Sequence, residues 1–87
     1  MRFPWELDER KLFATTMSRR GNGRYYLVAE ILPGGNGWDW SVWRSGDSKQ
    51  NARHGGASSV LKAMAIAQDV VMDWEASDDS VMIHASA

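Results

Sequence analysis

The chain has 87 residues, with 10 lysines and arginines against 11 acids and no cysteine. This length is that of one domain, and the missing cysteines exclude a disulfide framework and a thiolate metal site, so hydrophobic burial has to hold the fold together. Charges follow the first apolar residues at once, and no apolar run approaches the ~20 residues of a membrane span, so we expect a soluble, cytoplasmic protein without a membrane partner.

The first predicted strand covers residues 11–17, "KLFATTM". The longer segment "PWELDERKLF" also fits a short helix, with Pro4 at its first position and Glu6 paired with Arg10. We favour the strand because "RGNGR" follows it, and Asn-Gly between two β-type segments is a strong hairpin signal.

Two more strands are predicted on either side of a second turn. Residues 25–32, "YYLVAEIL", are rich in aromatic and β-branched side chains, and "PGGNG" then marks the turn into residues 38–44, "WDWSVWR". The three strands form an antiparallel meander. Residues 50–54 are either a short fourth strand or a loop, because they are polar, and the glycine pair after them is typical of a turn into a helix.

The last predicted element is a helix over residues 59–75, "SVLKAMAIAQDVVMDWE", with Ser58 or Ser59 as its N-cap. Helical periodicity places an apolar side toward the core, made of Val60, Met64, Ala67, Val71 and Trp74. A narrow polar stripe lies opposite, made of Lys62, Asp69 and Asp73.

A second apolar strip on the same helix consists of Leu61, Ala65 and Met72. A helix lying on one sheet does not need this strip for its core. Residues 78–87 are predicted as a tail beyond the domain of residues 1–77, either disordered or folded back. We expect either this tail or another chain to cover the strip.

These elements predict an α+β fold, an antiparallel meander of three to four strands packed on one long C-terminal helix. Their order is similar to small uncharacterised bacterial and phage domains built as a β-meander plus one helix. It also resembles the AP2-like DNA-binding domain of tyrosine recombinases. The positions that carry the resemblance are Trp40, Val42, Gly46, Gly55, Ser58 or Ser59, and Ala63.

In that DNA-binding family, the resemblance implies that the exposed sheet face enters the major groove and that basic side chains on the last strands meet phosphates. Here the corresponding connection, "DSKQNARHGG", carries only Lys49 and Arg53 besides His54. The resemblance therefore implies a fold and not a function.

No catalytic or metal-binding pattern is present in the sequence. His54 and His84 lie far apart, without a carboxylate at a ligand-like spacing. Ser58 and Ser59 are explained by helix capping, and "HGGASS" lacks the Gly-Lys-Ser/Thr ending of a phosphate loop. We expect neither an enzyme nor a cofactor.

The alternation of side chains along a strand divides the tryptophans of "WDWSVWR" between two faces of the sheet. Trp40 and Val42 share the helix-covered face with an apolar row on the neighbouring strand, made of Tyr25, Leu27, Ala29 and Ile31. We expect Trp40 and Trp74 to be core residues and Trp5 to cover one end of the core. The other face carries Tyr26, Val28 and Trp43 with the acids Glu30 and Asp39, and we expect no basic residue there.

We therefore expect a non-enzymatic interaction module that forms a homodimer or binds an unknown protein partner. The contact surface is predicted to be either the face with Tyr26, Val28 and Trp43 or the strip of Leu61, Ala65 and Met72. The alternative is a nucleic-acid-binding domain. Residues 10–54 hold eight lysines and arginines against three acids, and the predicted contacts are Arg19, Arg20, Arg24, Arg44, Lys49 and Arg53.

Overall fold

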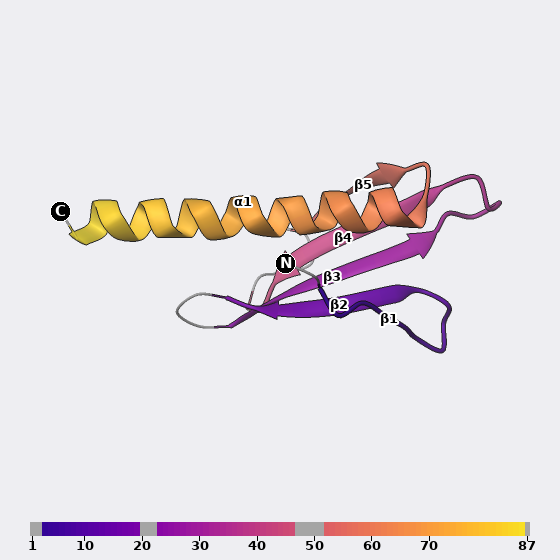
Figure 1. Ribbon diagram of the computed structural model, residues 1–87, viewed down its shortest axis with the longest axis horizontal. Coiled ribbons are helices and arrows are strands. Elements are labelled where there is room, and N and C mark those ends of the chain that lie inside the picture. Colours follow the sequence, from indigo (N-terminus) through magenta and orange to yellow (C-terminus); the bar gives the residue numbers. More distant parts are fainter. Residues whose placement is uncertain (1–2, 20–22, 47–51, 87) are drawn as a thin grey trace.

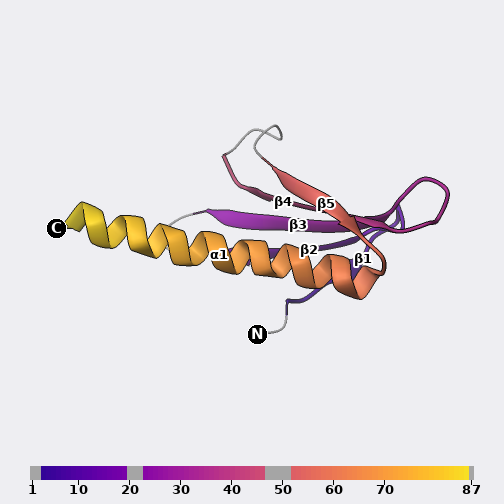
Figure 2. The ribbon, with the colours of Figure 1, turned by 90° about the horizontal axis from the view of Figure 1, so that it is seen from above.

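An antiparallel sheet with one helix on one of its faces forms a two-layer α+β fold (Figures 1 and 2). The computed structural model describes residues 3–19, 23–46 and 52–86, with residues 78–86 described through their backbone only. Within these ranges the elements are β1 (Glu6–Leu7), β2 (Phe13–Ser18), β3 (Arg24–Ile31), β4 (Trp38–Arg44), β5 (Arg53–Ala57) and α1 (Val60–Ser86). The five strands neighbour one another in chain order, so the predicted fold class is confirmed, with more strands than expected.

The N-terminal segment is extended, and the alternative of a short helix is wrong. Glu6 pairs with Ala14 and Leu7 with Phe13, which makes β1 a short edge strand. A turn closed by Asp8 joins β1 to β2: its carboxylate accepts the backbone N–H groups of Arg10 at 2.8 Å and Leu12 at 3.4 Å. Lys11 lies within this turn at φ 64°, so the second strand starts two residues later than predicted.

Partial desolvation raises the pKa of the Asp8 carboxyl, but the two backbone hydrogen bonds and the guanidinium of Arg10 outweigh it. The pKa of Asp8 therefore lies below its ordinary value of 3.8. The Arg10 guanidinium lies 3.2 Å from the Asp8 carboxylate. The ionised form of Asp8 is thus part of the turn.

The strand after the Trp-rich β4 is Arg53–Ala57, which includes the glycine pair that the sequence placed in a turn. Trp40 lies opposite Gly55 in the β4–β5 register. A Cβ at Gly55 would lie 3.1 Å from the indole of Trp40, whereas a Cβ at Gly56 would meet only the Trp38 carbonyl at 3.9 Å. The glycine gives room for the indole over the β5 backbone. The predicted start of this strand, at residues 50 and 51, lies outside the described residues.

Helix α1 starts as predicted but is longer. The Ser59 hydroxyl accepts the backbone N–H of Lys62 at 3.2 Å, so Ser59 caps the helix. The predicted end at Glu75 is wrong, because α1 continues to Ser86 and extends beyond the sheet (Figure 1). "SDDS" consists of weak helix formers, but neither glycine nor proline interrupts the run. The backbone of residues 78–86 continues the helix axis and does not fold back.

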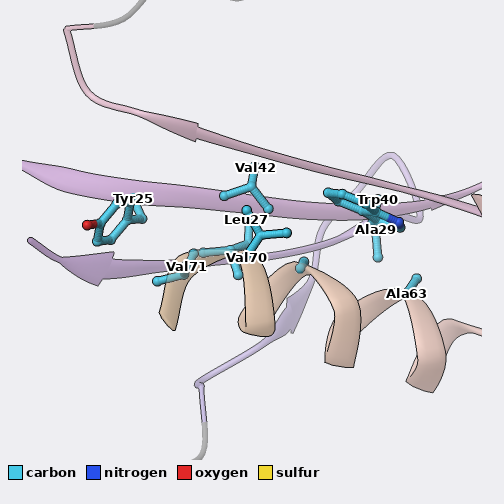
Figure 3. Close-up of a cluster of buried hydrophobic side chains, with 9 residues drawn as sticks. Tyr25, Leu27, Ala29, Trp40, Val42, Ala63, Val70 and Val71 are labelled. Atoms are coloured by element: carbon cyan, nitrogen blue, oxygen red, sulfur yellow. The ribbon is translucent and has the colours of Figure 1, made fainter. Parts of the chain in front are cut away.

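The core lies between α1 and strands β3 and β4 (Figure 3). Most of the predicted inward row is confirmed: Tyr25, Leu27, Ala29 and Val42 are fully buried, and Trp40 is 7% exposed. Ile31 shares this face but is 51% exposed at the last position of β3, so it is not part of the core as predicted. From the helix, Ala63, Ala67, Val70 and Val71 are buried. Val60, Met64 and Trp74 are only partly buried at the margins, so the predicted core side of the helix is rotated. Small side chains at positions 63 and 67 let α1 approach the sheet closely.

Phe3 and Trp5 pack against the edge of this core, which confirms the expectation for Trp5. The indole N–H of Trp5 donates to the Gln68 side-chain oxygen at 2.6 Å. The N-terminal segment therefore occupies one flank of α1.

Candidate interaction surfaces

The outer face, defined as the sheet face opposite α1, carries Tyr26, Val28 and Trp43. The Tyr26 and Trp43 rings are stacked, with centroids 5.6 Å apart and an interplanar angle of 20°. All three side chains are half-buried. Trp43 is therefore partly covered by its cross-strand neighbour, and the described chain places no second layer on this face (Figure 2).

A hollow of about 510 Å³ lies on the outer face beside Trp43. Its floor and rim are formed by Arg10, Leu12, Val28, Glu30, Ser41, Trp43, Ala52 and His54. The mixture of one indole, aliphatic groups and charges of both signs suits a polar contact surface better than an apolar pocket.

Charges on the outer face are separated along the strands. Glu30 and Asp39 lie directly opposite each other near one end, and Arg24 lies at the other end, two residues before Tyr26. The Arg24 guanidinium donates to the Thr16 hydroxyl at 2.7 Å. The expectation of no basic residue on this face is wrong, because β3 begins at Arg24 and not after it.

The predicted nucleic-acid contacts that the structure describes are divided between the two faces of the sheet. Arg44 lies over the Trp74 ring at 4.2 Å, and Arg19 lies over Tyr25 at 5.7 Å, both on the helix side of the sheet. Arg53 is exposed and pairs with Val42, again on the helix side, and only Arg24 reaches the outer face. Arg20 and Lys49 lie outside the described residues.

The second apolar strip of the helix is exposed. Leu61 is 74% and Met72 46% exposed, and Ala65 between them is exposed as well. Gln68, bound by Trp5, borders the strip on one flank, so the N-terminal segment reaches the edge of the strip and leaves Leu61 and Met72 open. The sequence contains no signal for this contact beyond the aromatic spacing of Phe3 and Trp5.

His54 projects from β5 on the outer face, across from Ser41. In residues 3–19, 23–46 and 52–77, where side chains are described, no group of three or more His, Cys, Asp or Glu side chains is arranged to hold a metal ion. Among the described helices, none is both long and apolar enough to cross a membrane.

In comparisons with known proteins, no family model, no curated protein and no solved structure matches this chain.

Proposed function

We propose that this chain is a non-enzymatic interaction module of the cytoplasm that forms a homodimer through the strip of Leu61, Ala65 and Met72. One observation supports this most directly: Leu61 is 74% exposed at the start of a well-capped helix, in line with a second exposed apolar side chain at Met72. Burial of a leucine side chain contributes about 1.5–3 kcal/mol. An apolar line of this kind on a helix is typical of helix–helix contacts.

The outer face is less suited to this role. Its aromatic side chains already bury part of their area against each other, and Glu30 faces Asp39 at the same surface. Desolvating two opposed carboxylates costs free energy that the apolar strip does not require. Among the described residues, Leu61, Ile66 and Met72 of α1 are each more than one-third exposed, whereas Tyr26, Val28 and Trp43 of the outer face are less exposed.

Light scattering on Leu61→Glu and Ile66→Glu tests the proposal. Ile66 lies on the other flank of α1 and is 37% exposed, so it offers the same substitution outside the strip. A single helix pair buries less area than a standard interface, so we expect a Kd on the order of micromolar for the wild type. Leu61→Glu should raise this Kd at least about tenfold, whereas Ile66→Glu should leave it close to the wild-type value. Equal masses for the two variants at every concentration would contradict the assignment of the strip.

A second candidate function is binding of single-stranded nucleic acid on the outer face. The stacked Tyr26–Trp43 pair with Arg24 on the same face supports it, because exposed bases stack on aromatic side chains beside phosphate-binding cations. It predicts binding to a labelled single strand at low salt that is lost in Trp43→Ala and falls steeply as salt is added. Absence of binding at low salt would exclude it.

A further inference from the structure

The apolar strip runs along the side of α1 that points away from the sheet. The residues of α1 that contact the sheet are Ala63, Ala67, Val70 and Val71. At about 100° per residue, Leu61, Ala65 and Met72 lie well over a quarter-turn from that direction. A partner seated on the strip therefore meets neither the sheet nor its edges.

Leu61 and Met72 lie eleven residues apart, so their Cα atoms are about 16 Å apart along the helix axis. Ala65 lies between them and lets a second helix approach closely. The strip thus has one large apolar side chain at each end and a small one between them. A strip of this kind can pack against the same strip of a second copy whether the two helices are parallel or antiparallel.

The neighbouring charges decide between the two directions. Lys62, Asp69 and Asp73 are exposed and form one stripe beside the strip, with the positive charge near the start of the helix. In a parallel pair, whose two-fold axis runs along the helices, the stripes of the two copies lie on opposite sides of the helix pair, so Lys62 meets neither aspartate of the other copy. In an antiparallel pair with Leu61 across from Met72, Lys62 falls between the two aspartates of the other copy.

We propose that two copies pair through antiparallel α1 helices, with Leu61 packed against the other copy's Met72 and a two-fold axis between positions 66 and 67. This geometry rests on the proposed homodimer and adds its direction and register. The sheets then lie on the outside, in four layers of sheet, helix, helix and sheet. Both copies present the same charged stripe on the same side of the helix pair, as an isologous interface requires.

Cysteine cross-linking tests the direction, and the chain offers a clean background because it has no native cysteine. The variants are Leu61→Cys, Met72→Cys and the double variant, each oxidised at a concentration where light scattering of the reduced protein gives a dimer. A disulfide requires Cα atoms within about 7 Å. The antiparallel pair predicts a covalent dimer for the double variant and none for either single variant, whose two cysteines lie about 16 Å apart.

Other outcomes overturn the inference in distinguishable ways. Covalent dimers of both single variants would mean parallel helices. Failure of all three to cross-link, with dimers seen by light scattering, would move the interface away from the strip. A monomer in the wild type at all concentrations would remove the homodimer itself.

Charge exchange gives an independent measurement. Lys62→Glu should raise the dimer Kd about three- to tenfold at low salt, and combining it with Asp69→Lys and Asp73→Lys should restore the wild-type value. A Kd for Lys62→Glu equal to that of the wild type would contradict the antiparallel register. In a parallel pair the charged stripes of the two copies lie on opposite sides, so the same substitution would change no charge contact between them.

Discussion

The indole of Trp40 in β4 lies over Gly55, its partner in β5. A Cβ at position 55 would lie 3.1–3.2 Å from three indole atoms, and Trp40 is nearly fully buried, so the ring has little room to shift. The alternation of the Trp-rich strand predicts the inward direction of Trp40, but the sequence alone does not show which residue lies opposite. From sequence alone the pair Gly55–Gly56 therefore indicates a turn, and only the register between β4 and β5 shows that it belongs to a strand.

Gly55→Ala should lower the free energy of unfolding by about 1–3 kcal/mol through overpacking against Trp40. Gly56→Ala is the matched control, because its added methyl group would meet only one carbonyl oxygen at 3.9 Å. We expect a change within about 0.5 kcal/mol for the control. Urea unfolding followed by tryptophan fluorescence measures both, and equal stabilities would show that Trp40 moves aside without cost.

The strands and the helix are predicted correctly from sequence where a capping residue or a run of residues with a clear structural preference is present. Ser59 and the good helix formers after it place the start of α1, and the aromatic, β-branched segments place β3 and β4. The end of α1 is not predictable in this way, because weak helix formers without glycine or proline leave the boundary undetermined. Strand β1 has two residues, too few for any periodicity, and depends on the Asp8 turn.

The Asp8 turn predicts a specific pH dependence. The folded-state pKa of Asp8 is lowered, so its contribution to stability is present above the ordinary value of 3.8 and is lost as the pH falls through the folded-state value. Asp8→Asn should therefore be less stable than the wild type at pH 7, and the difference should shrink as the pH falls below about 4. Glu9→Gln, an exposed carboxyl in the same turn, is the control. Thermal unfolding at several pH values measures the difference, and a gap independent of pH would contradict an ionised Asp8 in the turn.

In the whole molecule, a single helix covers one face of a sheet of five strands. Helix α1 packs on β3, β4 and β5, while residues 3–5 cover the side toward β1 (Figure 1). Two surfaces remain: the outer face with its stacked Tyr26–Trp43 pair and the strip from Leu61 to Met72. Helical periodicity locates the strip from sequence, because its residues do not fit the core side of the helix.

The sequence does not predict what lies over these surfaces. The hydrogen bond between Trp5 and Gln68 joins residues 63 positions apart, and no periodic pattern in the sequence indicates it. Arg24 lies on the outer face because β3 begins at Arg24, one residue before its predicted start at Tyr25. Alternation along β3 and β4 predicted most of the sheet side of the core, whereas the core side of α1 was predicted with a rotation, and the choice between the two surfaces needed the exposed areas of individual side chains.

Sedimentation equilibrium of the unmodified chain, from about one to several hundred micromolar, tests the homodimer most directly. We predict that the weight-average mass rises with concentration from that of one chain to that of two and stays there, as a closed two-fold pair requires. The mass of a single chain across the whole range would contradict the proposed homodimer.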